Sequence, residues 1–372
     1  KLTGKWSDTH SEELKRGITI KLGYADVIIK EENGKYTIDA ESKGKPQRYV
    51  TFVDAPGHEM LMATMLSGAA IMDAAILVIA ANEGIKPQTR EHLVALNAKK
   101  VKNIIIVQNK IDLVTKEQAL ENYKKIKEFV KDTIAENSQI IPVSAMQNIN
   151  INKILEALCK IPLEQKNTKD RPIFLVARSF DINRPGTEID KLHGGVLGGA
   201  LKQGILKIGD EIEIKPGYSY KKHDKFIYQT VKTKIVSMQK GDNKIQEASP
   251  GGSLAIETDL DPCLTKSDAL SGCVASTIGN LPEIKSEIRI KYELFKELFG
   301  TDAHDKVQEL RPLELLMLSI NTTITVGTVR KIKKGEVDLS LKIPVVPLKG
   351  ESAGIARNIN SHWRLIGFGE IL

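Results

Sequence analysis

Length, composition and charge already exclude several classes of protein. At 372 residues, with 41% hydrophobic and 27% charged side chains, the chain is too long for one ordinary domain and too apolar for a disordered protein. No apolar run approaches the ~18 residues that a membrane helix needs, and a net charge of +7 permits a nucleic-acid partner without requiring one.

Cysteine content and charge distribution narrow these classes further. Three scattered cysteines fit neither a disulfide framework nor a zinc cage, and the polar N-terminus shows no signal peptide, so we expect a reducing compartment such as the cytoplasm. Residues 1–166, 167–277 and 278–372 carry net charges of +3, +2 and +2. Because no segment is a basic block, we expect any polyanion to be held by a composite surface.

The first part of the chain alternates short apolar strands with helical patterns. In chain order, the expected strands are 48–53, 74–81, 103–107 and 139–143, and the expected helices are about 59–67, 87–96, 116–137 and 150–159. This alternation predicts a doubly wound, largely parallel α/β sheet. Ahead of it, Asn33-Gly34 lies between two apolar runs and predicts a hairpin with a tight turn.

Helical patterns almost disappear after a polar stretch at 164–170, which predicts a linker. Short alternating runs separated by Gly and Pro predict antiparallel barrels. The runs fall into two series, 173–178, 211–214, 232–237 and 254–257, then 288–294, 315–320, 324–329 and 337–341. We therefore predict a multidomain α/β plus all-β protein, with an α/β domain at 1–166 and β-barrel domains at 167–277 and 278–372.

Three polar motifs lie where predicted strands of the α/β domain end. They are Asp-Ala-Pro-Gly-His at 54–58, Asn-Lys-Ile-Asp at 109–112 and Ser-Ala-Met at 144–146. In an open α/β sheet, ligands bind outside the carboxyl ends of the strands. Each motif alone is modest evidence, but the three together at successive strand ends predict a nucleotide site.

The Asn-Lys-Ile-Asp motif has the chemistry of a guanine reader. The carboxylate of Asp112 can accept hydrogen bonds from the N1–H and the exocyclic amine of guanine, and adenine offers neither donor at these positions. Sites built on such bonds discriminate by ~10⁴ or more. Asn109 would brace the loop and Lys110 would cover the face of the base, while Ser144 and Ala145 would offer a backbone N–H to the guanine carbonyl oxygen.

The Asp-Ala-Pro-Gly-His motif has the composition of a γ-phosphate sensor. Asp54 can hold a Mg²⁺-bound water, and Gly57 lets a backbone N–H approach the phosphate without a Cβ in the way. His58 can position or polarise the attacking water, although in isolation a His after Pro-Gly is usually a turn residue. Upstream, Thr19 has a hydroxyl that can ligate Mg²⁺, but an ordinary strand threonine explains it nearly as well.

Together these motifs resemble the gamma subunit of archaeal and eukaryotic translation initiation factor 2, within the elongation factor Tu-like translational GTPases. The segments that carry the resemblance are 11–19, 54–68, 87–92, 178–183, 194–199, 264–268 and 363–367. They are spread over essentially the whole chain. The resemblance implies a P-loop-GTPase-type domain followed by two β-barrel domains.

The resemblance also implies an activity and partners. The family's gamma subunit binds GTP or GDP with Mg²⁺ and delivers initiator methionyl-tRNA to the small ribosomal subunit. Because the sequence shows no arginine assignable as a transition-state finger, we expect GTP hydrolysis to be slow unless a partner stimulates it. The gamma subunit works in a heterotrimer, with the alpha subunit on the second domain and the beta subunit on the GTPase domain. The tRNA acceptor end lies between the GTPase and second domains.

Site residues follow by the same resemblance. Carried over to this sequence, Asn109, Lys110, Asp112, Ser144, Ala145 and Met146 would surround guanine, Thr19 and the Gly17 carbonyl would lie at Mg²⁺ with Asp54 in its outer shell, and Gly57 and His58 would lie near the γ-phosphate. This assignment is the predicted site.

Two departures from the family pattern matter. The phosphate-binding string Gly-x-x-x-x-Gly-Lys-[Ser/Thr] is absent, and Lys1-Leu2-Thr3-Gly4 looks like the end of the helix that normally follows it. Because that loop supplies most phosphate contacts, the chain as written should bind GTP weakly or not at all, and we expect the native protein to carry an N-terminal piece with the loop and the first strand. In the second departure, the four-cysteine zinc knuckle that archaeal relatives often carry between the Arg-Gly-x-Thr loop and the Asp-x-Pro-Gly-His motif has no counterpart here. Residues 23–50 contain no cysteine, so we predict no structural zinc.

Two alternatives stay open. One is a nucleotide-independent scaffold that joins partner subunits and tRNA, which the absent phosphate loop would suit. The other is an elongation-type aminoacyl-tRNA carrier, which residues 181–183 and 264–268 disfavour because they match the initiation subunit better.

Overall fold

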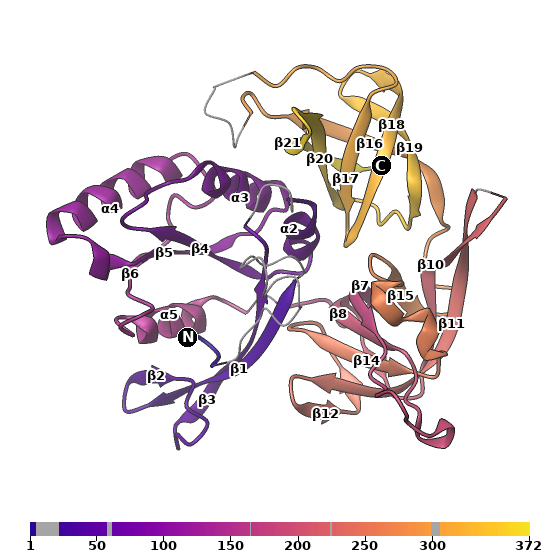
Figure 1. Cartoon of the computed structure of the whole chain (residues 1–372), viewed down its shortest axis with the longest axis horizontal. Helices are drawn as coiled ribbons and strands as arrows, with labels where there is room; N and C mark the ends of the chain where they lie inside the picture. Colours follow the sequence, from indigo (N-terminus) through magenta and orange to yellow (C-terminus); the bar gives the residue numbers. More distant parts are fainter. Residues whose placement is uncertain (5–21, 58–61, 164, 224, 299–305) are drawn as a thin grey trace.

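The computed structural model describes residues 1–4, 22–57, 62–163, 165–223, 225–298 and 306–372. An α/β unit comes first along the chain, followed by two β-barrels (Figure 1). We call them the middle barrel, β7 to β15, and the C-terminal barrel, β16 to β21. The predicted multidomain architecture, an α/β domain followed by two β-barrels, is confirmed.

The α/β unit begins with a three-stranded antiparallel sheet in the order β2-β1-β3. These strands are β1 Gly23–Glu32, β2 Lys35–Thr37 and β3 Lys45–Asp54. The predicted hairpin is confirmed, because Glu32 pairs with Lys35 and both turn residues, Asn33 and Gly34, have positive φ values of 52° and 76°. Asn and Gly tolerate that left-handed backbone best.

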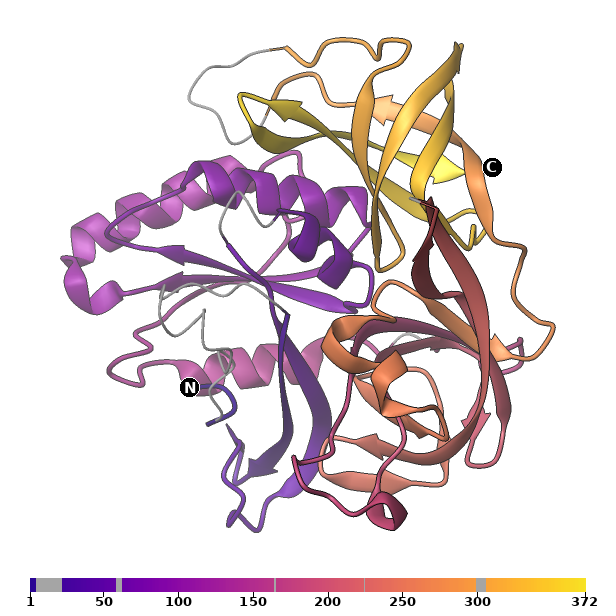
Figure 2. The ribbon, with the colours of Figure 1, turned by 45° about the vertical axis from the view of Figure 1, so that its right-hand side comes forward.

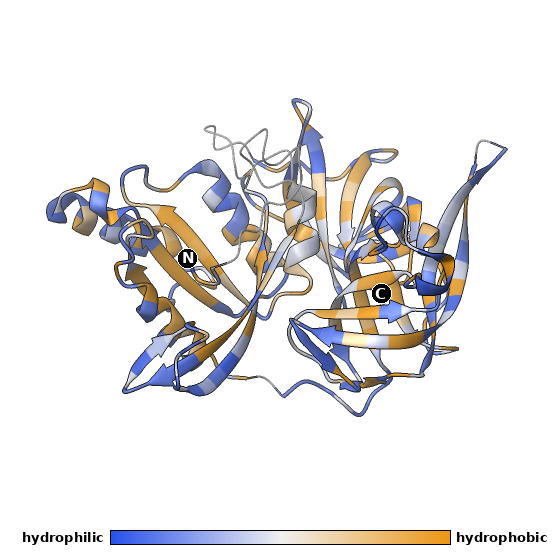
Figure 3. Cartoon of the chain, turned by 60° about the horizontal axis from the view of Figure 1, so that its bottom comes forward, coloured by the Kyte–Doolittle hydropathy of each residue, from blue (hydrophilic) through white to orange (hydrophobic). Residues whose placement is uncertain are grey.

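A second, parallel sheet follows in the order β4-β5-β6. Its strands are β4 Ala74–Ala80, β5 Asn103–Asn109 and β6 Ile140–Pro142, and the helices are α2 Met62–Ala69, α3 Pro87–Ala98, α4 Lys116–Val130 and α5 Ile151–Lys160. The residues in the middle of β4 and β5 are almost all apolar (Figure 3). The central strand β5 is covered on both faces, on one by α3 and α4 and on the other by α5 and the antiparallel sheet. In β4 one face is less well covered, and Val78 is exposed.

Two details of this unit differ from the predictions. The strand predicted at 48–53 lies in β3 and pairs antiparallel with β1, so the parallel part comprises three strands among the described residues. The helix predicted at 116–137 ends at Val130. There the hydroxyl of Thr133 donates to the Val130 carbonyl at 2.6 Å and accepts from the Ala135 N–H at 3.1 Å, a local turn that replaces the helical pattern.

The middle barrel closes through six strands, β10-β15-β7-β8-β14-β11, with β10 also paired to β11. The strands are β7 Ile173–Phe180, β8 Val196–Gln203, β10 Glu211–Lys222, β11 Lys225–Lys240, β14 Leu254–Thr258 and β15 Val274–Thr277, with the short β9 Leu206–Lys207, β12 Asn243–Ile245 and β13 Glu247–Ala248 beside them. The strands predicted at 211–214 and 232–237 are only the inner parts of β10 and β11, which form one long hairpin.

The C-terminal barrel is closed in the order β16-β19-β18-β17-β20-β21. Its strands are β16 Lys285–Leu294, β17 Leu315–Ile320, β18 Thr323–Lys333, β19 Glu336–Val345, β20 Ser352–Ile359 and β21 His362–Ile371. Side chains at alternate positions point inward, as in β19, so each strand contributes one apolar face to the interior.

The α/β unit contacts both barrels (Figure 2). Toward the C-terminal barrel, Arg364 of β21 donates to the buried carboxylate of Glu91 in α3 at 2.8 Å. Toward the middle barrel, the N–H of Ser253 donates to the Thr51 hydroxyl at 3.1 Å. Among the helices that the structure describes, none is long and apolar enough to cross a membrane.

Candidate functional site

The turn after β5 and the turn after β6 are tied together. Asn109 is the last residue of β5, and its Oδ1 accepts the backbone N–H of Ala145 at 3.1 Å. The N–H of Ile111 donates to the carbonyl of Val143 at 3.3 Å. The two predicted guanine motifs therefore form one hydrogen-bonded frame, in which the Asn109 side chain is the brace.

Lys110 occupies a strained but anchored position in this frame. Its φ is 60°, in the left-handed region, and its Nζ lies 2.8 Å from Oε1 of Glu83. The hydrogen bond from Lys110 lowers the pKa of the Glu83 carboxyl. Sequence reasoning missed Glu83, because no pattern links the loop after β4 to a residue 27 positions later.

The other guanine candidates differ in exposure. Asp112 is exposed in the 3₁₀ turn Ile111–Leu113, where a base could reach it, and Met146 is 83% exposed. Ser144 is fully buried, and its hydroxyl accepts the Gln147 N–H at 3.1 Å. The backbone N–H groups of Ser144 and Ala145 already have acceptors within the protein, so guanine would share or exchange those bonds.

The end of β3 carries the phosphate-side candidates. Asp54 is the last residue of β3, and both it and Gly57 are exposed. A Cβ built on Gly57 would lie 3.8 Å from the ring of His92 in α3. Burial lowers the pKa of His92, which favours the neutral imidazole at pH 7. No role had been predicted for His92, although it closes the 87–92 segment that carries part of the resemblance.

Three predicted residues, Gly17, Thr19 and His58, lie outside the described residues. Of the predicted Mg²⁺ site only Asp54 can therefore be placed, at the end of β3. Within the described ranges, His, Cys, Asp and Glu side chains form no group of three that could hold a metal ion.

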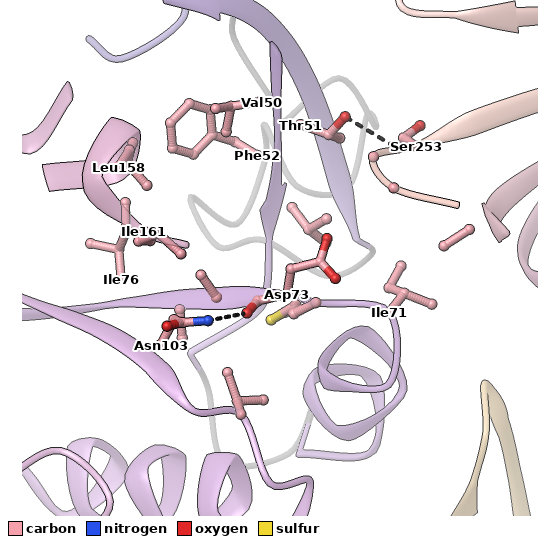
Figure 4. A pocket seen from close by; sticks show the side chains of 18 of the residues that line it. Val50, Thr51, Phe52, Ile71, Asp73, Ile76, Asn103, Leu158, Ile161 and Ser253 are labelled. Carbon is pink, nitrogen blue, oxygen red and sulfur yellow. Dashed lines mark hydrogen bonds between the residues drawn. The ribbon is translucent and has the colours of Figure 1, made fainter. Parts of the chain in front are cut away.

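A cavity of about 970 Å³ lies between β3 and β4 (Figure 4). Each of these strands has one strand neighbour among the described residues, β1 for β3 and β5 for β4, so both turn an edge toward the cavity. Two of the residues that line it carry buried polar atoms, the Tyr24 hydroxyl and Arg48 Nε, for which the described part of the chain provides no hydrogen-bond partner. Buried polar atoms normally have hydrogen-bond partners, so the cavity suits an occupant that can form hydrogen bonds, such as a peptide backbone.

Two known protein families match separate parts of the chain. Residues 2–162 match the family described as "Elongation factor Tu GTP binding domain". Residues 286–371 match the family "Initiation factor eIF2 gamma, C terminal". The first match covers the α/β unit and the second covers the C-terminal barrel.

Solved structures share the fold. The chain aligns over its whole length with a bacterial selenocysteine-specific elongation factor EF-Sec, at 24% identity and a TM-score of 0.76, and spans 54% of that longer chain. It also aligns over 95% of its length with translation elongation factor SelB from Methanococcus maripaludis in complex with GppNHp, at 22% identity and a TM-score of 0.71, covering 73% of that chain.

Curated relatives are much more similar in sequence. Translation initiation factor 2 subunit gamma from Methanococcus vannielii is 51% identical over all of this chain and 94% of the relative. The subunit gamma of Pyrococcus furiosus is 49% identical, again over the full chain and 92% of the relative. At this identity and coverage, the chain belongs to the gamma-subunit family of translation initiation factor 2.

Proposed function

We propose that this chain binds GTP with Mg²⁺ and hydrolyses it slowly unless a partner stimulates the reaction. The hydrogen bond from the Ala145 N–H to Asn109 Oδ1 carries the proposal, because it holds the two turns that would surround guanine in one rigid frame. Family membership supports a translational GTPase, and the exposed carboxylate of Asp112 is accessible to a base.

Each predicted residue has a defined role in this proposal. Asp112 reads the base; Asn109, Lys110, Ser144, Ala145 and Met146 frame it; Thr19, Gly17 and Asp54 hold Mg²⁺ or its waters; and Gly57 and His58 act at the γ-phosphate. The metal would supply charge neutralisation of the phosphates.

The assembly is proposed on family grounds. The GTP-bound form would carry initiator methionyl-tRNA to the small ribosomal subunit, as the gamma subunit of an alpha–beta–gamma heterotrimer in the cytoplasm. The alpha subunit would bind the domain at 167–277 and the beta subunit the domain at 1–166. Residues 278–372 would form the third domain.

Phosphate binding needs a loop that these 372 residues do not contain. A strand placed in the cavity between β3 and β4 would pair with both edges and join the two sheets into one. A Gly-x-x-x-x-Gly-Lys-Thr loop at its carboxyl end would direct backbone N–H groups at the phosphates. The Tyr24 hydroxyl and Arg48 Nε, which are buried and have no partner among the described residues, support such an occupant.

Base selectivity tests the proposal. In the chain preceded by an apolar strand and that loop, Asp112→Asn should shift selectivity from guanine toward xanthine nucleotides by on the order of 10⁴. The new amide opposes the donors of guanine but donates to the carbonyl of xanthine. Fluorescent GDP and XDP titrations measure the shift, and Asp132→Asn, the same change in an exposed turn, is the control. Unchanged selectivity would remove Asp112 from base reading.

Two further measurements separate the alternatives. The 372-residue chain should bind GDP weakly and the extended chain tightly. If the extended chain binds no nucleotide, the scaffold function is favoured instead. In the extended chain, His58→Ala should slow hydrolysis with little change in GTP affinity; lost affinity with normal turnover contradicts its role at the attacking water.

A further inference from the structure

The long hairpin of the middle barrel projects from the protein body. β10 and β11 have 12 and 16 residues. Beyond the barrel, their pairing continues from the pair of Tyr218 with Gln229 to the pair of Lys222 with Lys225. We call residues 218–223 and 225–229 the outer hairpin. It lies on the side of the molecule opposite the α/β unit (Figures 1 and 3). Sequence patterns had predicted only the inner strands, so this element was unexpected.

Positive charge is concentrated on this hairpin. Residues 218–229 contain three lysines, Lys221, Lys222 and Lys225, and one acidic residue, Asp224, for a net charge of +2. The predicted domain 167–277 also has a net charge of +2, so the rest of that domain is neutral overall. The excess positive charge of the domain therefore lies on its projecting hairpin, which favours a polyanionic partner there.

Aromatic and aliphatic side chains are exposed among these lysines. Tyr220 pairs with Ile227, and these side chains are 38% and 37% exposed. One step away along each strand, Lys221 pairs with Phe226, which is 61% exposed. Paired residues share a face and successive residues alternate faces, so each face of the outer hairpin combines an aromatic ring with lysine.

We propose that the outer hairpin binds an unpaired segment of RNA in the small ribosomal subunit. Lysines would contact phosphates, and Tyr220 and Phe226 would stack on bases, the combination used to bind single strands. Stacking on unpaired bases uses the exposed rings and the lysines together, which favours RNA over an acidic protein.

The position of the outer hairpin favours ribosomal RNA over transfer RNA as its partner. The proposed tRNA acceptor end lies between the α/β unit and the middle barrel, whereas the outer hairpin lies on the far side (Figure 1). Ribosomal rather than transfer RNA therefore fits this surface. The choice of the ribosome rests on the proposed function; the RNA chemistry of the hairpin does not.

Two double variants test the chemistry. The protein is titrated into a labelled oligouridylate of about 12 nucleotides, and binding is followed by fluorescence anisotropy in the absence of GTP and GDP, at salt concentrations from about 50 to 200 mM. Lys222→Gln/Lys225→Gln should make the salt dependence shallower by about 1.4 in log–log slope, since each single-strand phosphate contact contributes about 0.7. Tyr220→Ala/Phe226→Ala should weaken binding by about 5- to 100-fold and leave the slope unchanged.

Controls isolate the hairpin from general charge and folding. Lys116→Gln/Lys124→Gln removes two exposed charges from α4 and should leave both affinity and slope unchanged. The hairpin variants should unfold at the wild-type temperature, because the substituted side chains are exposed. Equal losses in the α4 and hairpin variants, or no loss in either hairpin variant, would overturn the proposal.

A second assay identifies the source. The hairpin variants should bind isolated small ribosomal subunits more weakly and initiator tRNA as the wild type does. Weaker tRNA binding with unchanged subunit binding would refute the ribosomal assignment. Tighter binding to polyglutamate than to RNA would point to an acidic protein and overturn the proposal. Because the RNA titration contains no nucleotide, a failed GTP-binding test leaves its result unaffected.

Discussion

The C-terminal barrel and the sheets of the α/β unit are built from similar apolar strands but differ at their edges. In the barrel each of six strands has two neighbours, so the ladder closes. In the α/β unit, β3 and β4 each have one neighbour in the described part of the chain and face each other across a cavity. Ile355 inside the barrel is fully buried, whereas Val78 of β4 is 55% exposed.

The difference teaches that apolar strand composition does not decide how complete a sheet is. Closure removes unpaired edges, while the two open edges of the α/β unit leave room for a further strand. We therefore expect rigid, cooperative behaviour from the barrel and its contacts, and tolerance of change along the cavity. The following predictions test that contrast.

The largest effect should come from the ion pair that joins the two regions. Arg364→Leu should lower the free energy of unfolding by about 3–5 kcal/mol, because it leaves the carboxylate of Glu91 buried without the arginine. Urea denaturation measures the loss. Glu91→Leu/Arg364→Leu should recover most of it, and Arg289→Leu, which breaks the exposed pair with Asp338, should cost far less. Equal costs for the two arginine variants would contradict this account.

The second-largest difference should appear when an apolar side chain is truncated in each region. Ile355→Ala should cost about 2–4 kcal/mol, because a closed barrel cannot collapse onto the cavity that forms. Val78→Ala should lower the free energy of unfolding by only a few tenths of a kcal/mol, since much of that side chain is already in solvent. Both values come from the same urea titrations. A Val78→Ala cost that matches the barrel value would mean that the edge of β4 is packed after all.

Two glycines give a sharper contrast. A Cβ on Gly369 of β21 would lie 2.1 Å from Ile290 Cγ2, whereas the nearest described atom to one on Gly57 is in the His92 ring, at 3.8 Å. Gly369→Ala should therefore destabilise by about 1–3 kcal/mol, and Gly57→Ala should leave the melting temperature nearly unchanged. If Gly57 acts at the γ-phosphate, its variant should instead slow GTP hydrolysis in the extended chain. A large melting shift for Gly57→Ala would show that its backbone position is structural.

Local signals account for what could be predicted from the sequence. Asn33-Gly34 specifies its turn by backbone conformation alone, and the motifs at 54–58, 109–112 and 144–146 follow strands that apolar runs reveal. The brace between Asn109 and Ala145 was anticipated only as a role for Asn109, because the acceptor and donor are 36 residues apart.

Other features depend on pairings that no local pattern encodes. The long hairpin of β10 and β11 interrupts its apolar alternation with Pro216-Gly217 and then lysines, which look like a turn, although the strands continue past a register shift. Glu91 and Arg364 are separated by 273 positions, and neither sits in a charge pattern that indicates a partner. The cavity between β3 and β4 arises from sheet order, which strand composition does not determine.

The last prediction concerns Lys99, at the junction between α3 and the C-terminal barrel. Its Nζ donates to the carbonyls of Ser319 and Ser352 at 3.2 Å each, and burial lowers its pKa to about 8. In the unfolded chain the pKa returns to about 10.4. Between these values the unfolded state binds more protons, so the stability of the wild type should rise with pH.

Comparison with Lys99→Met isolates this effect from all other titrating groups. From pH 8 to 9.5 the wild type should gain up to about 2 kcal/mol relative to the variant, and the difference should be flat below pH 7 because Lys99 is then protonated in both states. The ionisation of Tyr24 and Tyr49 in the unfolded chain, near pH 10, lies above this window and is common to both proteins. Urea denaturation at each pH provides the measurement. A difference that falls with rising pH would mean that the two carbonyls stabilise the ammonium more than burial penalises it, and that the junction is more polar than the barrel it joins.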